Sequence, residues 1–430
     1  MLYHWYEFSH AALSPARIAA DSYRLMLKNP LNPFAHTAVG RSAAAAFEMF
    51  ERSTRRYGKP PFGIAETMID GQRIPVQENI VWRRNFCNLL NFKRKMPAKV
   101  KGGQSKLLLV APMSGHYATL LRGTVADMAP RHDVYITDWQ DARDVPLDEG
   151  HFDLDHYIDY LIEIFEYFGG DIHVAAVCQP SVPVLAAISI MEAEGNPNVP
   201  RSMTLLGGPV DTRLNPTVVN KLAESRGTAW FEQNVIMRVP WPARGVGRRV
   251  YPGFLQLTGF MTMNLDRHMT AHKELFRHLI EGDGDSVEKH KKFYDEYLAV
   301  MDLTAEFYLQ TVESIFVRHA LPRGVMTHRD RLVDPSAIKN VPLLTIEGEM
   351  DDITGVGQCS AAHDLCSGLA NSNKEQYIQP GVGHYGVFNG SQFRSKIAPR
   401  ISRFIDKYSQ RPLKAGVIRR GSGIKSGKSD

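Results

Sequence analysis

The sequence predicts an α/β fold with a mostly parallel central sheet and helices on both of its faces. Short unbroken apolar runs, such as residues 107–113 and 174–178, are typical of buried parallel strands. Other segments carry apolar residues at steps of three and four, as residues 154–168 do, and this pattern indicates helices that cover a sheet. Strands that alternate with helices of this length indicate crossover units and therefore a parallel sheet.

Residues 1–98 come before this alternation and are predicted to form a helical N-terminal segment. The Ser14-Pro15 pair is a typical helix start, and that helix should end before Pro30. A second helix is expected over residues 34–57. The chain opens on four aromatic residues that we expect to pack on the body of the protein or, less often, to contact an apolar ligand: Tyr3, Trp5, Tyr6 and Phe8.

The core of the fold is predicted in two parts, residues 99–210 and 335–410. The first part should contain strands at 107–113, 134–139, 174–178 and 203–210, and helices over 117–128, 154–168 and 181–195. The second part should contain strands at 341–346 and 376–378, and helices over 356–369 and 391–408.

Residues 211–334 interrupt the alternation, because they contain helical patterns and no convincing strand. One helix is expected to start at Asn215-Pro216, and others are expected over residues 269–280, 287–298 and 305–316. A helical insertion between two strands of such a sheet is typical of a lid over a site. A structural dimerisation cap is the alternative interpretation.

The composition is that of an ordinary soluble enzyme, with 43% hydrophobic and 23% charged residues. A net charge of +5, without a basic face or a reading motif, argues against nucleic-acid binding. No apolar run is long enough to span a membrane, and the N-terminus lacks the pattern of a secretory signal. The four cysteines form no CxxC pair, which favours free thiols in the cytoplasm. The basic tail, residues 411–430, is predicted to be disordered.

Residues 171–195 carry the strongest chemical signal in the chain. The strand at 174–178 is followed at once by the turn Cys178-Gln179-Pro180 and by a helix from about Ser181. A strand, a sharp turn with a nucleophile at its apex and a helix together form a nucleophile elbow. The nucleophile would be the Cys178 thiol, because a helix N-terminus and a neighbouring imidazole both stabilise a thiolate. A buried cysteine with no catalytic role is the alternative for this residue taken alone.

Asp351 and His384 are the predicted partners of Cys178. Asp351 follows the strand at 341–346, and His384 lies in the glycine-rich loop after the last strand. Nucleophile, acid and histidine is the chain order of α/β-hydrolases, and each position follows the carboxyl end of a strand, where ligands gather on parallel sheets. His384 would take the thiol proton and later give it to the leaving alkoxide, and Asp351 would hold the imidazole.

A tetrahedral intermediate also needs donors for its oxyanion. The backbone N–H of Gln179 is the first candidate, and that of Met113, in the loop after the first core strand, is the second. Two neighbours compete for the triad roles. Asp352 is the alternative to Asp351, and Ser181 is the alternative nucleophile, although we expect it inside the helix rather than on the turn.

No cofactor and no metal site are predicted. The sequence contains no phosphate-binding loop, no dinucleotide fingerprint and no zinc-ligand spacing. The acidic pairs Glu163/Glu166 and Asp283/Asp285 are interpreted as solvated positions. His116, near the predicted oxyanion loop, is interpreted as a structural histidine, with a supporting role near the site as the alternative.

Five stretches of the sequence resemble the intracellular polyhydroxyalkanoate (polyhydroxybutyrate) depolymerases. They are AVCQPSVPVLAA, VAPMSGHYATLLRGTV, VYITDWQDARDVPL, LLTIEGEMDDITGVGQ and GVGHYGVFNG. The likeness runs from the N-terminus to the last predicted helix and leaves out only the basic tail. Its most specific mark is the box around the nucleophile, Ala176-Val177-Cys178-Gln179-Pro180, where most α/β-hydrolases have Gly-x-Ser-x-Gly.

The resemblance implies an α/β-hydrolase fold with a triad of Cys178, Asp351 and His384. It also implies that the enzyme hydrolyses amorphous polyhydroxybutyrate in cytoplasmic storage granules of bacteria. The reaction would pass through an acyl-enzyme at the thiol and release 3-hydroxybutyrate monomers and short oligomers. Several apolar residues of the insertion are expected to pack in the core or, as the alternative, to touch the polymer: Trp230, Phe231, Trp241, Phe254, Leu257, Phe260 and Met261.

Three alternatives stay open at this point. A polyhydroxyalkanoate synthase would have a similar fold and triad and would run the reverse chemistry from a hydroxyacyl-coenzyme A, but Pro180 stands where synthase boxes usually have glycine. The acyl group could pass to coenzyme A instead of water, although no phosphate-binding motif favours this. A non-catalytic granule coat protein is the third alternative, and the intact triad argues against it. The sequence also leaves room for a homodimer.

Overall fold

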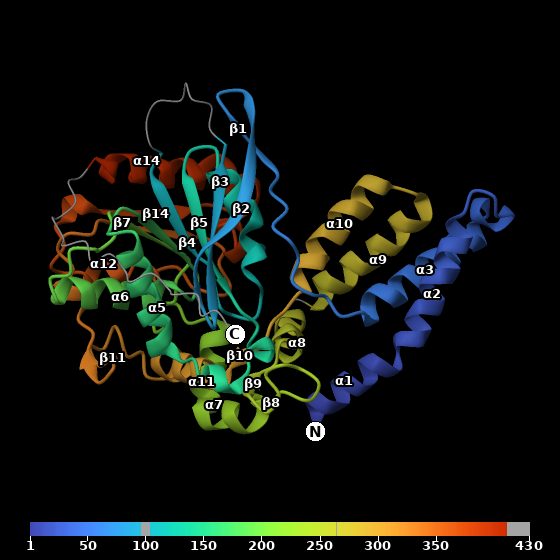
Figure 1. Ribbon diagram of the computed structural model, residues 1–430, viewed down its shortest axis with the longest axis horizontal. Helices are drawn as coiled ribbons and strands as arrows, with labels where there is room; N and C mark the ends of the chain where they lie inside the picture. The colour runs from blue at the N-terminus through green and yellow to red at the C-terminus, as the bar shows by residue number, and fades with distance from the viewer. Residues whose placement is uncertain (96–103, 264, 411–430) are drawn as a thin grey trace, which may run out of the picture.

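The computed structural model of the protein describes residues 1–95, 104–263 and 265–410 (Figure 1). A nine-stranded sheet forms its centre, with the strand order β1-β2-β3-β5-β4-β6-β7-β13-β14. Six neighbouring strands are parallel: β5 (Asp133–Trp139), β4 (Lys106–Val110), β6 (His173–Val177), β7 (Ser202–Leu206), β13 (Leu343–Gly348) and β14 (Lys374–Gln379). The predicted α/β fold with a mostly parallel sheet is confirmed.

Strand β6 lies between β4 and β7 in the middle of this sheet. Val110 at the end of β4 pairs with Ala176, and Val177 at the end of β6 pairs with Leu206 at the end of β7. The loops that leave the three strands therefore start side by side at one edge. Ligand sites of open parallel sheets form at this edge.

Helices cover both faces of the sheet (Figure 1). Helix α5 (Leu154–Tyr167) packs beside α6 (Ser181–Ala193) on one face, and α4 (Arg122–Met128) packs beside α14 (Ala398–Ser409) on the other. The apolar residues of α5 that recur at steps of three and four are buried, and the Tyr157 ring stacks on Trp139 of β5 at a centroid distance of 4.2 Å. The apolar period of this helix thus predicts its packing correctly.

The prediction of an all-helical segment over residues 1–98 is wrong for its second half. Residues 66–94 form β1 (Glu66–Ile69), β2 (Gln72–Arg84) and β3 (Cys87–Arg94), which extend the sheet by antiparallel pairing, with β3 next to β5. These strands lie at the sheet edge, and most side chains of β2 are at least partly exposed. Strands in this position carry mixed polar and apolar residues instead of an unbroken apolar run.

The helix predicted over residues 356–369 is wrong in extent, because only α12 (Ala362–Leu365) is α-helical. The Glu347 carboxylate accepts hydrogen bonds from the backbone N–H groups of Gly357, Cys359 and Ser360. These donors are therefore held by a side chain from β13 and not by a helical ladder. The segment before α12 is a folded turn.

The insertion, residues 211–334, is mostly helical, as predicted, but it also contains short strands. Its helices are α7 (Val218–Val235), α8 (Gly253–Met263), α9 (Leu265–Glu281), α10 (Gly284–Tyr297) and α11 (Ala305–Thr311), and α11 continues into the π-helical turn η5 (Val312–Val317). The strands β8 (Met237–Arg238), β9 (Arg249–Tyr251) and β10 (Leu303–Thr304) form a small sheet, and β11 (Thr327–His328) pairs with β12 (Arg331–Leu332). Strands of two or three residues are too short to show a sequence period.

The first three helices form an arm that projects from the body (Figure 1). They are α1 (Leu2–Ala12), α2 (Ser14–Lys28) and α3 (Ala38–Thr54). Helices α2 and α3 agree with the two helices predicted to end before Pro30 and over residues 34–57, while the sequence does not predict α1 as a separate helix. Helix α3 packs on α2 and on α9 of the insertion. We call residues 1–57 the arm.

Short helical turns complete the chain: η1 (Pro33–His36), η2 (Ala118–Leu121), η3 (Ala142–Asp144), η4 (Leu147–Glu149), η6 (Pro335–Ala337), η7 (Asn371–Asn373), η8 (His384–Val387), α13 (Gly390–Gln392) and the π-helical turn η9 (Phe393–Ile397). Within the described ranges, no helix is both long enough and apolar enough to cross a membrane. The predicted disordered tail, residues 411–430, lies outside the described residues.

Candidate active site

Cys178 stands on a sharp turn between β6 and α6. Its backbone has φ = 66°, in the left-handed region that a non-glycine residue seldom adopts. The Cys178 N–H donates to the Leu206 carbonyl at 2.7 Å, and the Ser181 N–H donates to the Cys178 carbonyl at 3.0 Å, so both sides of the turn are held. Strain that the surrounding structure maintains is typical of functional positions. The geometry is that of a nucleophile elbow.

The turn requires a glycine at position 208, in the loop after the neighbouring strand β7. A Cβ atom at Gly208 would lie 2.2 Å from the Cβ and Oγ atoms of Ser181 at the start of α6. The Ser181 side chain is therefore enclosed beneath the turn, and it is fully buried. This placement inside the helix explains why Ser181, the alternative nucleophile, does not line the cavity in front of Cys178.

His384 and Asp351 lie together beside the elbow. The His384 Nδ1 atom and the Asp351 Oδ2 atom are 2.7 Å apart, and both side chains are buried. The other oxygen of Asp351, Oδ1, accepts from the backbone N–H groups of Ile353 and Thr354 at 2.9 and 2.8 Å. The structure thus brings Asp351 to the histidine, while its neighbour Asp352 is exposed.

His384 also lies beside Cys178, and both side chains line the same cavity. Burial of the imidazole lowers its pKa, but the nearby negative charge of an ionised Cys178 and the hydrogen bond to Asp351 outweigh burial and raise the pKa of His384 to about 10. The structure therefore brings the three predicted triad side chains together, in the order thiol, imidazole, carboxylate.

The two residues predicted to supply the oxyanion donors are neighbours in the structure. The Met113 backbone N–H donates to the side-chain Oε1 of Gln179 at 3.4 Å. A carbonyl-type oxygen therefore occupies the position in front of this N–H group. The Nε2 atom of Gln179 is buried and has no hydrogen-bond partner within the described part of the chain. The sequence prediction used only the backbone of Gln179 and did not include this side-chain amide, which also lines the cavity.

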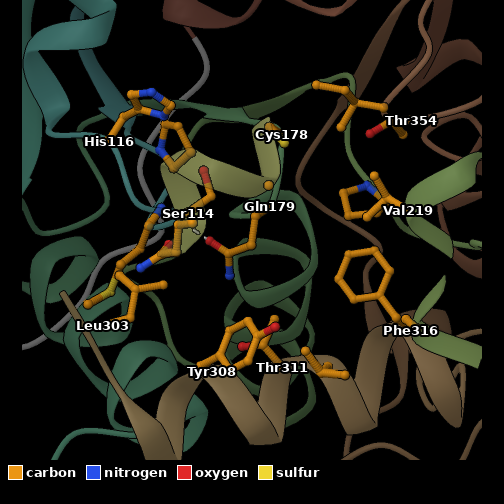
Figure 2. A pocket seen from close by; sticks show the side chains of 18 of the residues that line it. Ser114, His116, Cys178, Gln179, Val219, Leu303, Tyr308, Thr311, Phe316 and Thr354 are labelled. Carbon is orange, nitrogen blue, oxygen red and sulfur yellow. Dashed lines mark hydrogen bonds between the residues drawn. The ribbon is translucent and has the colours of Figure 1, made fainter. Parts of the chain in front are cut away.

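A cavity of about 340 Å³ opens in front of Cys178 (Figure 2). One wall comes from the core and carries Ser114, Cys178, Gln179 and His384, and the opposite wall comes from the insertion. The insertion residues are mostly apolar: Val218, Val219, Leu222, Ala223, Phe231, Tyr251, Gln256, Gly259, Leu303, Phe307, Tyr308, Thr311, Val312 and Phe316. The insertion thus covers the site, as predicted for a lid; its opening and closing stay a prediction.

Two tyrosines place a polar group inside this apolar wall. The ring centroids of Tyr251 and Tyr308 lie 4.2 Å apart, and both residues line the cavity. Burial raises the pKa of Tyr251 to about 12, so the hydroxyl stays protonated. Each of the two hydroxyls carries one hydrogen that it can donate to a ligand. Neither tyrosine is predicted as a site residue, because an aromatic residue in a helical insertion has no distinguishing sequence signal.

His116 supports the loop that carries Met113. Its Nε2 atom lies 3.1 Å from the Tyr297 carbonyl, and burial lowers the pKa of this imidazole to about 4. The Met301 N–H donates to the Gly115 carbonyl in the same region. These contacts tie the loop after β4 to the insertion. His116 also lines the cavity, so both interpretations of this residue stay compatible with its position.

The aromatic residues predicted for the lid have several different surroundings. Phe231 lines the Cys178 cavity and contacts Trp230, while Trp241 is 81% exposed. Phe254, Leu257 and Met261 border a second cavity, of about 820 Å³, beneath α1. The Phe260 side chain lies outside the described part of the structure.

The opening aromatic residues divide into two pairs. The Tyr3 hydroxyl donates to Asp302 at 2.6 Å, and the Tyr6 ring stacks on Phe254 at 4.2 Å, so these two anchor α1 on the insertion. Trp5 and Phe8 point outward and are exposed. The prediction that the opening residues pack on the body therefore holds for half of them.

One cluster outside the cavity has metal-ligand character. Donor atoms of His151, Asp153 and His156 lie within 4.8 Å of one another at the start of α5. Asp153 already accepts from the backbone N–H and the ring of His156 as the helix N-cap. A helix N-terminus carries partial positive charge, which opposes a cation. The cavity in front of Cys178 includes none of these three residues.

Comparisons with known proteins give one family and a set of structural likenesses. Residues 207–409 match the family described as the C-terminus of PHB de-polymerase. No curated protein sequence matches the chain. A thermophilic esterase from Thermogutta terrifontis is 11% identical, with a TM-score of 0.39, over 80% of this chain and 97% of that chain. A monoacylglycerol lipase from Paleococcus ferrophilus is 12% identical, with a TM-score of 0.39, over 71% and 96% of the two chains. The hypothetical protein PA2218 from Pseudomonas aeruginosa is 12% identical, with a TM-score of 0.42, over 83% and 98%.

Proposed function

We propose that this chain, whose residues 207–409 match the PHB de-polymerase family, is a hydrolase of carboxylic esters, and we propose a substrate and a mechanism for it. The proposed substrate is amorphous polyhydroxybutyrate, and the proposed nucleophile is Cys178. The observation that carries the mechanism is the position of Cys178 beside His384 and the contact of His384 with Asp351, at the base of an apolar cavity.

In the first half-reaction the Cys178 thiolate attacks the carbonyl carbon of an ester in the polymer. A C–S bond forms, and the carbonyl oxygen becomes an oxyanion that the N–H groups of Gln179 and Met113 bind, once the Gln179 side chain has moved from Met113. The ester C–O bond then breaks. The protonated His384 gives its proton to the departing alkoxide, which leaves as the alcohol end of a shortened chain. The acyl group stays on Cys178 as a thioester.

In the second half-reaction water releases the acyl group. The neutral His384 takes a proton from water, the hydroxide attacks the thioester carbonyl, and the C–S bond breaks to give a 3-hydroxyacid and the thiolate. Asp351 keeps the same role in both halves. It accepts from Nδ1–H, so that Nε2 faces Cys178, and it stabilises the imidazolium.

The cavity fits an aliphatic polyester better than a charged substrate. Its insertion wall is apolar, which suits the methyl and methylene groups of hydroxybutyrate units. A polyester also carries one carbonyl per unit, and we propose that the hydroxyl pair of Tyr251 and Tyr308 donates to one of them. The free Nε2 of Gln179 is a further donor for the ester under attack. The substrate implies that the protein works at the surface of storage granules in the cytoplasm.

The test is the release of 3-hydroxybutyrate from amorphous granules by purified protein. Cys178→Ala should lower the rate by at least ~10⁴-fold, because nothing replaces the nucleophile, while Cys178→Ser should keep partial activity. Cys366→Ala is the matched control, since this buried cysteine lies outside the cavity, and its rate per folded molecule should stay near that of the wild type.

Three outcomes would contradict parts of the proposal. An unchanged rate in Cys178→Ala would remove Cys178 from the mechanism. Acyl-coenzyme A formed in place of free acid, when coenzyme A is added, would replace water as the acceptor. Growth of a polymer from hydroxybutyryl-coenzyme A would make the protein a synthase.

A further inference from the structure

Helices α1 and α2 turn their apolar side outward. Their exposed large apolar side chains are Leu2, Trp5, Phe8, Ile18, Tyr23, Leu25 and Met26. Among the acidic and basic residues between positions 2 and 28, only His4 and Lys28 are exposed. An isolated surface helix normally shows the opposite arrangement, with its polar side toward water.

The basic residues of α2 reach toward α3 and the end of α1. Arg17 donates to the carbonyl groups of His10 and Thr54 at 2.9 and 3.0 Å. Lys28 and Arg24 pair with Glu48 of α3, a carboxylate that is almost fully buried. These contacts fix the rotation of α2 about its own axis. The apolar face of α2 is consequently held outward and cannot turn into the body.

Seven of the outward positions form one stripe along both helices, at steps of three and four. The stripe consists of Trp5, Phe8, Ala12, Ala16, Ala19, Tyr23 and Met26, all of which are exposed. Side chains at such steps lie above one another on a helix. Large side chains occupy both ends of the stripe, and three alanines occupy its middle.

The stripe exposes a continuous apolar surface. Its four large side chains, Trp5, Phe8, Tyr23 and Met26, are each more than half exposed. Since aromatic side chains cover roughly 150–250 Å² each, these four leave on the order of 500 Å² of apolar surface. The largest apolar patch of a typical monomer is about 300–600 Å². A standard protein interface covers about 800 Å² on each partner, so the stripe can form the apolar centre of such an interface.

The stripe is complementary to itself when reversed. The stripe has a midpoint between residues 15 and 16. Three pairs of stripe residues are equally far from it in sequence: Trp5 with Met26, Phe8 with Tyr23, and Ala12 with Ala19. In an antiparallel pair about a two-fold axis at this midpoint, each large side chain meets a large one. The small residues meet in the middle, where the two backbones can approach closely. Self-complementarity of this kind defines an isologous interface.

We propose that the stripe on α1 and α2 is a homodimer interface, in which the arms of two copies of this chain pack antiparallel. Ala12 of one copy faces Ala19 of the partner subunit, and Phe8 faces Tyr23 of the partner subunit. The inference does not depend on the proposed function. A flat polymer surface is the other apolar occupant, but such a surface gives no reason for small residues at the centre of a symmetric stripe.

The test uses the full chain and measures its mass in solution by sedimentation or light scattering. The wild type should be a dimer at micromolar concentration. Ala12→Lys alone and Ala19→Asp alone should each weaken the dimer at least tenfold, because each places an unpaired charge in the interface. The double variant should recover most of the affinity, because the two introduced charges are opposite and each then faces its counterpart on the other copy. Ala46→Lys on the exposed side of α3 is the matched control and should stay dimeric.

Each contrary result overturns the proposal. A wild type that is monomeric at these concentrations would exclude the interface. Single variants that stay dimeric would move the interface elsewhere, and a double variant no better than the singles would exclude the antiparallel register. A monomeric wild type whose granule binding is lost in Ala12→Lys would assign the stripe to the polymer surface. Circular dichroism of every variant separates these results from a loss of folding.

Discussion

Helices α6 and α2 are similar in length, and both carry many apolar residues, but their surroundings are opposite. In α6 the first nine residues are all buried, and even the hydroxyl of Ser189 is turned to the Leu185 carbonyl. In α2 only Ala20 is buried, and the apolar side chains face outward. The rest of the chain covers α6 on all sides along these nine residues. The outer face of α2 needs a second molecule.

This difference separates the part of the protein that carries the proposed chemistry from the part that carries the proposed assembly. The elbow at Cys178 is held from behind by α6 and from the side by Gly208, where no side chain fits. A small displacement there moves the nucleophile relative to His384. A change on the outer side of α2 moves nothing near the cavity. Substitutions in the two regions should therefore differ in size and in the property that they alter.

Among substitutions that keep the Cys178 thiol, the largest effect on activity is expected for Asp351→Asn in the core. An asparagine at this position can turn its NH₂ group toward Nδ1, which favours the wrong tautomer of His384, so kcat/KM for a soluble ester should fall roughly 10²–10⁴-fold. The exposed neighbour gives a matched control, because Asp352→Asn leaves the contact intact and should change kcat/KM less than about twofold. Equal losses in both variants would show that the carboxylate at 351 has no special role.

Ile188→Ala tests the enclosed helix itself. Ile188 is fully buried within α6, so its truncation leaves a cavity and should lower the free energy of unfolding by about 2–5 kcal/mol. Urea denaturation followed by circular dichroism measures this loss. A loss below about 1 kcal/mol would mean that α6 is less tightly enclosed than its burial indicates.

The pKa of His384 in Cys178→Ala tests how strongly the thiol and the imidazole interact at the elbow. In the wild type, the neighbouring thiolate outweighs burial and raises the pKa of His384 to about 10. Cys178→Ala removes that negative charge while burial still opposes protonation, so the pKa should move down. Titration of ¹⁵N-labelled histidine by NMR measures the change. In the wild type the apparent pKa describes the coupled pair of Cys178 and His384, and in the variant it describes His384 alone. An unchanged pKa would mean that Asp351 alone holds the proton.

The sequence predicts the enclosed part of the protein well, for a physical reason. Strands buried on both faces are mostly apolar, so β4, β6 and β13 are visible as short apolar runs. Cys178 and Asp351 follow two of these strands, β6 and β13, while His384 follows the partly exposed strand β14. The three positions lie beyond the carboxyl ends of parallel strands, which meet at one edge of the sheet. The contact between His384 and Asp351 thus follows from a pattern that composition and spacing already contain.

The sequence predicts poorly those parts of the protein that are near water or that depend on contacts between distant segments. The strands β1 and β2 mix polar and apolar residues, because many of their side chains are near water. Strand β3 is mostly buried but also contains polar residues, so it shows no unbroken apolar run. The Tyr251–Tyr308 pair depends on how the insertion folds back over the core, and no local spacing encodes that contact. The outward orientation of α2 depends on Glu48, a residue of a different helix, which binds the charged side chains of α2.

The smallest effect is expected for Ile18→Ala, the counterpart of Ile188→Ala on the outer side of α2. Ile18 is 66% exposed, so its truncation removes little buried surface from the single chain. Alanine also has a higher helix propensity than isoleucine. At concentrations low enough to keep the protein monomeric, the free energy of unfolding should therefore stay within about 0.5 kcal/mol of the wild type. Urea denaturation at a series of dilutions measures it. A loss above about 1 kcal/mol in the monomer would mean that the single chain already covers this face, and the contrast between α2 and α6 would then disappear.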